Sequence, residues 1–100
     1  MSHKYTLIVY TNPAEGREDE YNAWYDDIHL PEFTALPGVI AGRRFTVAGG
    51  DKAKYAAIYE LSAHPDEVMA AMNAAMKDGT VHWSDAVDAT SVTMTTLEPR

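Results

Sequence analysis

The chain has 100 residues, of which 46% are hydrophobic and 23% charged, as is ordinary for a single folded domain spanning residues 1–100. Its net charge of −7 argues against binding to nucleic acid or to anionic membranes, since both require a basic surface. The absence of cysteine excludes disulfides and thiol chemistry. The opening MSHKYTLIVY lacks the pattern of a signal peptide and no apolar run approaches the ~20 residues of a membrane span, so we expect a cytoplasmic protein.

The start of the chain predicts a strand followed by a helix. Residues 4–12 (KYTLIVYTN) are rich in β-branched and aromatic residues and end at an Asn-Pro pair, which predicts a strand. Residues 15–28 predict a helix, because apolar residues recur at the spacing of one helical face: Tyr21, Trp24, Tyr25 and Ile28. Pro31 cannot continue a regular helix, so we expect this helix to end or kink just after His29.

The middle of the chain predicts a β-hairpin. Residues 39–47 and 54–61 predict its two strands, and the intervening AGGDK (48–52) supplies the glycines that a tight loop needs. Side chains alternate along a strand, so Tyr55 and Tyr59 are expected to share one face of the second strand.

The last third of the chain predicts a second helix and a final strand. The helix is expected to begin at His64-Pro65 and to end near Gly79. Its apolar face is Val68, Met72, Ala75 and Met76. Residues 80–88 (TVHWSDAVD) predict a loop or a short helical turn, and residues 89–97 predict the strand.

The resulting order, β-α-β-β-α-β, is that of a ferredoxin-like α+β fold, with a four-stranded antiparallel sheet and two helices on one face. Two helices leave the second face of the sheet uncovered, yet the predicted strands carry apolar residues on both faces. Closed two-fold dimers are the commonest assembly of such chains, so we expect a homodimer that packs sheet against sheet.

The segment EYNAWYDDIHLPEFTALPGVIAGRRF resembles the dimeric α/β-barrel superfamily, in particular its small EthD-like proteins. The shared features are a Trp-Tyr pair followed by a histidine and a proline, then a Pro-Gly turn and a strand with arginine and aromatic residues. The motif covers Tyr21 to Phe45, and the element order matches over the whole chain. The resemblance implies a pocket between sheet and helices into which His29 points. It also implies cofactor-free proton transfer by a histidine with a tyrosine, on a small phenolic or polyketide-like substrate.

His29 is the main candidate catalytic residue. On an ideal helix Asn22, Tyr25 and His29 share one edge of the buried stripe, where a polar group reaches a cleft without leaving the core. A histidine gives and takes protons near neutral pH, and Asp26, three residues earlier, is placed to orient its ring. The alternative is that His29 only contacts the terminal carbonyls of the helix.

Tyrosine and arginine side chains supply further candidates. Tyr25, Tyr55 and Tyr59 are phenol donors, although core packing with a satisfied hydroxyl explains each of them as well. Arg43 and Arg44 stand on opposite faces of one strand, and we favour Arg44 for polarising a substrate carbonyl or carboxylate.

The pair His82-Trp83 lies in the loop expected to cover the pocket, so both residues are candidates for substrate binding; the alternative is a surface loop. No metal site is expected, because Pro31 separates His29 from Glu32 and no second histidine lies nearby. The glycines at 48–52 do not lead into a helix, so they form no phosphate loop.

These features favour a cofactor-independent enzyme. His29 would carry out acid/base chemistry, namely elimination, isomerisation or cyclisation, on a small apolar carbonyl or phenolic compound. One alternative is a monooxygenase of the same fold, either cofactor-free or haem-linked, in which His29 or His82 would ligate the iron. Another is a dimer that binds small molecules without chemistry.

Overall fold

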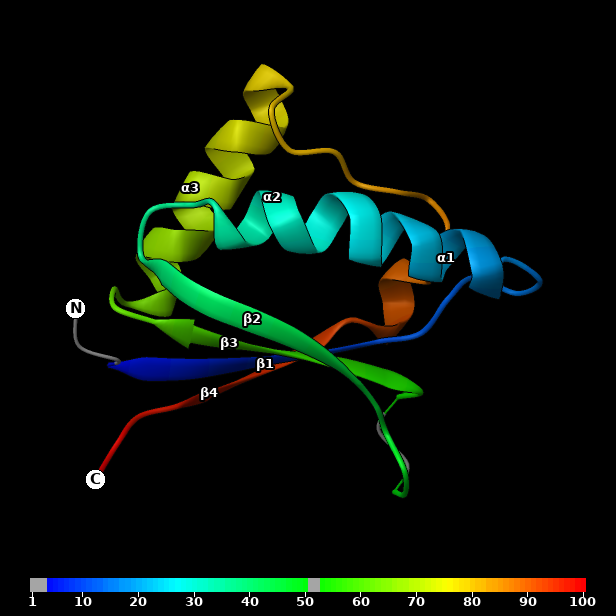
Figure 1. Cartoon of the computed structure of the whole chain (residues 1–100), viewed down its shortest axis with the longest axis horizontal. Coiled ribbons are helices and arrows are strands. Elements are labelled where there is room, and N and C mark those ends of the chain that lie inside the picture. Colours follow the sequence, from blue (N-terminus) through cyan, green and yellow to red (C-terminus); the bar gives the residue numbers. More distant parts are fainter. Residues whose placement is uncertain (1–3, 51–52) are drawn as a thin grey trace.

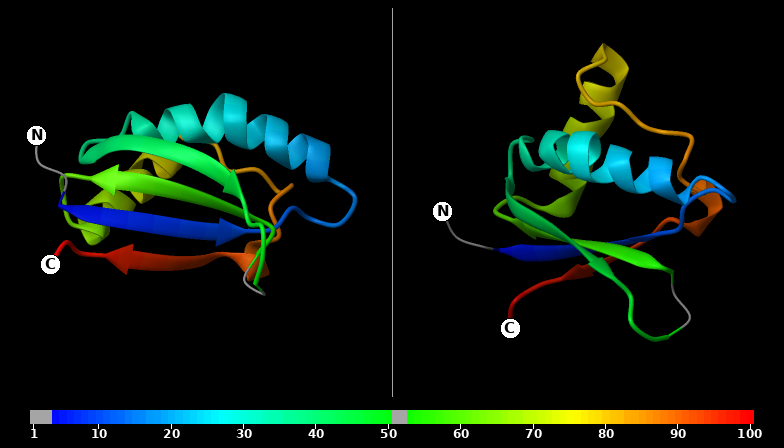
Figure 2. Two further views of the ribbon diagram at one scale, coloured as in Figure 1. Left: turned by 60° about the horizontal axis from the view of Figure 1, so that its bottom comes forward. Right: turned by 45° about the vertical axis from the view of Figure 1, so that its right-hand side comes forward.

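The computed structural model describes residues 4–50 and 53–100. Its centre is an antiparallel sheet with the strand order β2-β3-β1-β4, and the helices cover one face of it (Figure 1). The strands are β1 (Tyr5–Thr11), β2 (Val39–Thr46), β3 (Tyr55–Leu61) and β4 (Thr93–Leu97). This is the ferredoxin-like βαββαβ arrangement expected from the sequence, and the two views of Figure 2 show its two layers.

The helical layer consists of one long composite helix and a second, shorter one. The composite helix is built from α1 (Glu18–Trp24), η1 (Tyr25–His29) and α2 (Leu30–Thr34). The second helix, α3 (Pro65–Asp78), crosses it at one end, and a short 3₁₀ turn, η2 (Ala89–Ser91), precedes the last strand.

The composite helix continues through Pro31 to Thr34, so it does not end after His29; of the two expected outcomes, an end or a kink, the first is wrong, and the helix is instead irregular just before the proline. The reason is that η1 is a π-helical turn, in which the backbone N–H of Leu30 bonds to the carbonyl of Tyr25, five residues earlier. A regular helix would press the proline ring against the carbonyl four residues back. The wider turn just before Pro31 relieves that clash and lets the helix go on.

The π turn also changes which residues face the sheet. Ile28, expected on the buried stripe, is 41% exposed, whereas His29 is 4% exposed and takes the inward position. The inward series is therefore Tyr21, Tyr25, His29 and Phe33, at steps of four. One inserted residue in the turn has moved the histidine from the edge of the stripe to its centre.

The second half of the chain follows the sequence prediction with one correction. The side chain of His64 caps α3 by accepting from the N–H of Asp66, and Gly79 ends that helix in the left-handed region at a φ of 86°. The final strand begins at Thr93 instead of residue 89. Asp88 accepts from the N–H of Thr90, which turns the chain into η2 before the sheet is reached.

The sheet presents different residues to its two faces, as the alternation predicted. Leu7, Val9 and Tyr59 lie under the helices and are buried, while the cross-strand pair Ile8 and Ile58 lies on the opposite face. The loop at 48–52 lies partly outside the described residues, but the strands that it joins are confirmed. The homodimer that would cover the open face stays a prediction.

Among the described residues, none of the helices combines the length and apolar character needed to cross a bilayer.

Candidate active site

A small cavity of about 50 Å³ lies between the composite helix, α3 and the sheet. Its lining is mostly aromatic, aliphatic and thioether: Val9, Tyr25, His29, Phe33, Tyr59, Met69, Met72, Trp83, Val92 and Met94. A space of this size holds a few water molecules and is well below the 300–1,000 Å³ of an ordinary ligand pocket. Trp83 and Met94, 40% and 47% exposed, are the wall residues nearest to solvent.

The imidazole of His29 is enclosed by aromatic rings. It stacks on the indole of Trp24, with 4.7 Å between centroids and 19° between planes. Tyr25 and Trp83 meet it edge-on, at 5.0 and 5.4 Å. These contacts hold the ring in one orientation and leave it only 4% exposed.

The electrostatic surroundings keep His29 neutral. The pKa of His29 is lowered to about 4, mainly by burial; the charge of Glu32 opposes this shift, and the charge of Arg44 adds to it. Its Nδ1 atom is buried and has no hydrogen-bond partner among the described residues. At neutral pH the site therefore holds an uncharged imidazole, which lines the cavity and forms no hydrogen bond through its buried Nδ1 among the described residues.

Two buried tyrosines bring their hydroxyls together at the wall of the cavity. The hydroxyl oxygens of Tyr25 and Tyr59 are 3.4 Å apart, and the Tyr59 ring packs on Phe33 with 4.4 Å between centroids. Burial raises the pKa of Tyr25 to about 12 and raises the pKa of Tyr59 well above its ordinary value. Both phenols are therefore protonated at neutral pH and act as hydrogen-bond donors.

Arg44 lies on the helix-facing side of β2, as favoured, but outside the cavity. Its guanidinium carbon is 4.3 Å from the centre of the Tyr25 ring, and its amino groups donate to Asp26 and Asn22 at 2.8 and 2.9 Å. The side chain is only 11% exposed, and its Nε has no partner among the described residues. Tyr25 thus lies between the arginine and the space that His29 lines.

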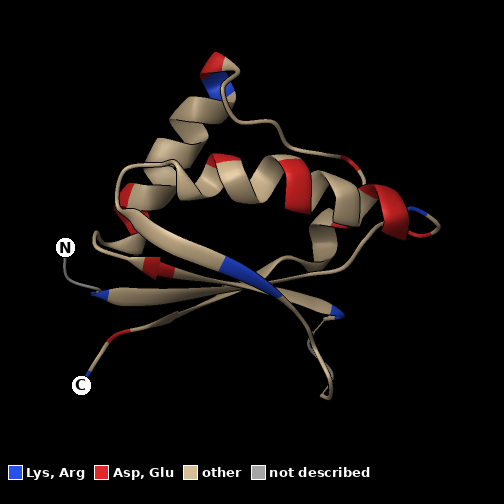
Figure 3. Cartoon of the chain, in the orientation of Figure 1, with Lys and Arg blue, Asp and Glu red and all other residues tan. Residues whose placement is uncertain are grey.

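Three other predicted residues gather around Arg44 in an open polar cleft of about 440 Å³. Asp26 pairs with Arg44, so the expected orienting contact with His29 is not formed. The amide of Asn22 donates to the hydroxyl of Tyr55 at 3.2 Å, and that hydroxyl donates to Glu18. Figure 3 shows the acidic residues along the composite helix and the basic segment of β2 that carries Arg44.

The two residues of the late loop point in different directions. Trp83 covers His29, whereas the ring of His82 turns outward to Glu32, with 2.8 Å between Nδ1 and the carboxylate. Only His29 among the predicted histidines lines the cavity. Within residues 4–50 and 53–100, no cluster of three or more histidine, cysteine, aspartate or glutamate side chains is arranged to hold a metal ion.

Comparison with solved structures identifies the fold. A candidate monooxygenase from Shewanella loihica has a TM-score of 0.66 at 13% identity, over 100% of this chain and 97% of its own. An EthD-family protein from Bacillus halodurans has a TM-score of 0.62 at 17% identity, over 97% and 99%. MhuD, a haem-degrader from Mycobacterium tuberculosis seen with two haems in its active site, has a TM-score of 0.66 at 13% identity, over 95% and 94%.

The chain has the fold of the dimeric α/β-barrel superfamily. The resemblance read from the sequence is thereby confirmed at the level of fold. Comparisons with protein-family models and with curated protein sequences find no match. Identities of 13–17% do not transfer a reaction, so the chemistry has to be argued from the residues of this chain.

Within this dimeric α/β-barrel fold, sequence reasoning missed part of the cavity wall. Phe33 follows Pro31, beyond the point at which the helix was expected to end or kink, so no inward position was predicted for it. The steps of four from Tyr21 to Phe33 are the signal that would have found it. Met94 and Val92 reach the cavity from the β4 end of the chain, and nothing in the local pattern indicates that.

Proposed function

We propose that this protein is a cofactor-independent enzyme that moves a proton on a small phenolic or enolisable carbonyl compound, with His29 as general base and acid. The observation that carries the proposal is a neutral imidazole, with no hydrogen-bond partner at its buried Nδ1, beside two protonated phenols in the wall of a mostly apolar cavity. Perturbed titratable groups in a cavity are the features by which active sites are recognised.

In the proposed reaction His29 takes a proton from a hydroxyl or an activated carbon of the substrate. The electron pair stays on the substrate and places negative charge on its oxygen. The hydroxyl of Tyr59 or Tyr25 donates a hydrogen bond to that oxygen, which stabilises the charge as it forms. His29 then returns the proton to another atom, completing an isomerisation or cyclisation, or to a departing hydroxyl, completing an elimination.

The low pKa of His29 is compatible with this role. A neutral imidazole accepts a proton, and the imidazolium formed lies beside the anion formed on the substrate. In a dry site that pair attracts strongly, which raises the affinity of His29 for the proton as the reaction proceeds. If dioxygen were the co-substrate, the same deprotonated phenol would be the starting point of a cofactor-free monooxygenation.

The size of the cavity restricts the substrate. A one-ring compound needs more than about 50 Å³, so side chains at the mouth have to move. The thioethers of Met69, Met72 and Met94 adapt readily to a ligand, since methionine has a flexible and polarizable side chain. The proposal is therefore limited to compounds of about one ring.

Haem does not fit the site as it stands. The cavity is far below the volume of a large planar cofactor, and the imidazole of His29 lies face to face with Trp24. The other predicted histidine, His82, bonds to Glu32 outside the cavity. An absorbance titration with haem that showed a Soret shift, lost in His29→Gln, would instead favour the haem-linked alternative.

We further propose a homodimer formed through the open face of the sheet. Ile8 and Ile58 pair on that face, and Phe45, 45% exposed, lies beside them on β2. An apolar sheet face of this kind is covered in most soluble proteins. Light scattering should give twice the mass of the chain, and Ile58→Lys should give a monomer.

Turnover of small phenols and ketones by wild type and two histidine variants tests the enzymatic proposal. His29→Gln should lose turnover by about a hundredfold or more, because a general base contributes 10²–10⁴ in rate. The matched control is His64→Asn, which removes an imidazole outside the cavity and keeps a residue able to cap α3. Equal turnover in wild type and His29→Gln would overturn the proposal, and saturable binding without product would favour the non-catalytic binder.

A further inference from the structure

Residues 80–88 form a segment that we call the strap, because it runs from the tip of α3 along the composite helix toward the α1 end (Figure 1). Val81 and Ala86 are buried at its two ends, and the carbonyl of Ala86 accepts from the N–H of Ala14 at 2.6 Å. Of the four residues between these anchors, His82, Trp83 and Asp85 are exposed. The middle of the strap is thus held at both ends and lies on the surface.

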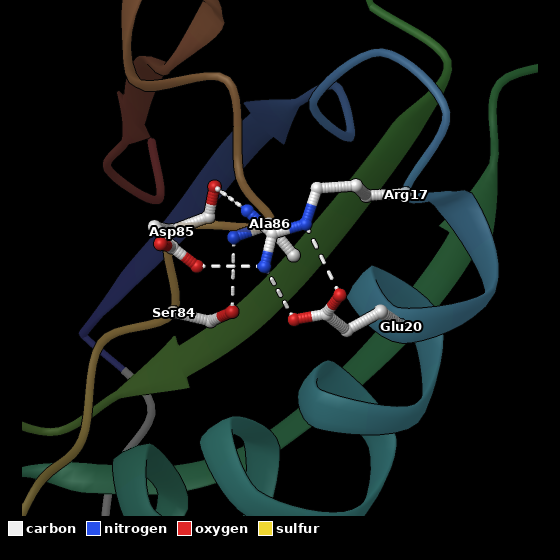
Figure 4. Close-up of polar contacts among 5 residues, drawn as sticks. All are labelled: Arg17, Glu20, Ser84, Asp85 and Ala86. Atoms are coloured by element: carbon white, nitrogen blue, oxygen red, sulfur yellow. Dashed lines mark hydrogen bonds and ion pairs between the residues drawn. The ribbon is translucent and has the colours of Figure 1, made fainter.

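Glu32 and Trp24 of the composite helix, and Arg17 just before it, fasten the middle of the strap. Glu32 accepts from the N–H of His82 at 2.9 Å and pairs with its ring at 2.8 Å. The indole N–H of Trp24 donates to the carbonyl of His82 at 3.1 Å. Arg17 donates to the carbonyl and the carboxylate of Asp85 at 3.1 and 2.7 Å, as Figure 4 shows.

These fastenings are weak enough to open. The side chains of His82 and Asp85 are 67% and 89% exposed, so solvent screens both pairings, and the pairing with Glu32 is an ion pair only when the His82 ring is protonated. Segments held by few buried contacts open locally well before the rest of a protein unfolds. By contrast, nearly all of the remaining cavity wall belongs to helices or strands, which cannot withdraw without losing backbone hydrogen bonds.

Trp83 is the only side chain that the strap contributes to the cavity wall. Its indole meets His29 edge-on at 5.4 Å and 90°, and meets Trp24 at 5.4 Å and 78°. One aromatic ring thus closes the space beside the imidazole, and a planar ring of similar size placed there would regain those aromatic contacts.

We infer that Trp83 is the gate and the specificity-determining residue of the site: when the middle of the strap lifts, a single aromatic ring enters beside His29 in its place. The inference deepens the proposed function and depends on it, since it names the substrate class as planar compounds of one ring. Larger ring systems are excluded by the indole as long as Trp83 remains on the strap.

The first test compares the affinities of phenol and of 2-naphthol, measured by calorimetry on wild type, Trp83→Ala and Trp83→Phe. Truncation to alanine should shift the preference toward 2-naphthol by about tenfold or more, as expected when a pocket gains room for a second ring. Phenylalanine should give a smaller shift. Circular dichroism checks that each variant is folded, and the phenylalanine variant keeps the test decisive if the alanine variant is not. An unchanged preference in the folded variants overturns the inference.

The second test measures the rate at which phenol binds after the fastening is weakened. Glu32→Gln removes a carboxylate that holds His82, and the association rate should rise several-fold. Asp27→Asn removes an exposed carboxylate of the same helix and should leave the rate unchanged. Equal rates in the two variants contradict a gate in the strap.

Both tests measure binding and not turnover, so the two ideas can fail separately. Suppose that wild type binds phenol, that His29→Gln loses turnover, and that Trp83→Ala keeps the preference of wild type. The enzymatic proposal then stands and the gate is overturned. A changed preference with full turnover in His29→Gln keeps the gate and overturns the role of His29. If phenol binds none of the proteins, or if 2-naphthol binds none of them, the inference is overturned.

Discussion

Gly42 on β2 and Tyr59 on β3 are paired across the sheet, and the Tyr59 ring lies where a side chain at position 42 would stand. A methyl group there would be 2.6 Å from one ring carbon of Tyr59 and 2.9 Å from the Cγ2 of Thr34. The glycine is therefore required by close packing and not by its backbone angles. It lets the tyrosine lie flat enough for its hydroxyl to reach Tyr25.

We predict that Gly42→Ala destabilises the fold and displaces Tyr59. Overpacking of a core position costs about 1–3 kcal/mol. The matched control is Gly49→Ala, because a methyl group at Gly49 meets no atom within 4 Å. Chemical denaturation should show the loss only in the first variant, and equal stability in the two variants would contradict the packing account.

Burial of neutral His29 makes stability depend on pH. The pKa is about 4 in the folded protein and about 6.5 when unfolded, so the unfolded chain binds more protons between these values. Stability from this group is therefore fully present above pH 6.5 and is lost as pH falls toward 4. The loss amounts to about 3 kcal/mol by pH 4.

Denaturation of wild type and His29→Gln at several pH values measures this effect. Other acidic groups titrate in the same range in both proteins, so the difference between the two curves isolates His29. Wild type should lose the additional stability as the solution is acidified. Parallel curves would mean that the imidazole is accessible to protons in the folded state.

Activity should depend on pH through the same residue. Because the unprotonated imidazole is the active form, kcat/KM should be level near neutrality and fall as pH drops through about 4. A rate profile measured from pH 3.5 to 8 checks this. A fall centred near 6.5 would assign the titration to a histidine in water.

The hydroxyl of Tyr59 should matter for turnover, and that of Tyr55 should not. Tyr59→Phe removes a donor that lines the cavity, and the loss of one such donor costs about 10²–10³ in kcat when it stabilises a developing oxyanion. Tyr55→Phe removes a hydroxyl that lies in the polar cleft beside Asn22. Comparable kcat values for both variants would remove Tyr59 from the mechanism.

Arg44 should influence the pKa of His29, although the Tyr25 ring lies between Arg44 and the cavity. Its charge lowers the pKa of His29, so Arg44→Met should raise that pKa toward its ordinary value. The control is Arg43→Met, since Arg43 pairs with Ile58 on the opposite face of the sheet. An NMR titration of the His29 ring follows both variants, and equal values would mean that Arg44 acts only through packing.

The prediction from sequence succeeded where a periodic pattern decides the structure. Alternation along the strands placed Tyr55 and Tyr59 on one face and separated Arg43 from Arg44, because side chains in a strand have a period of two. The element order followed from turn residues and helix ends. It led to the fold that the comparisons confirm.

It failed where one interaction overrode the pattern. The rule that proline ends a helix is correct for a regular helix, but the π turn before Pro31 removes the clash and moves His29 inward. The contact between Glu32 and His82 joins residues 50 positions apart, so no local pattern indicates it. For the same reason Asp26 was assigned to its neighbour His29 instead of Arg44.

A crystal structure of the protein with phenol bound tests the central claim most directly. The account predicts the ring of phenol beside His29, with its hydroxyl within hydrogen-bond distance of the imidazole and of the Tyr59 hydroxyl, and with Trp83 moved away from the cavity. Phenol bound only in the cleft around Arg44, with Trp83 still closed over His29, would contradict it.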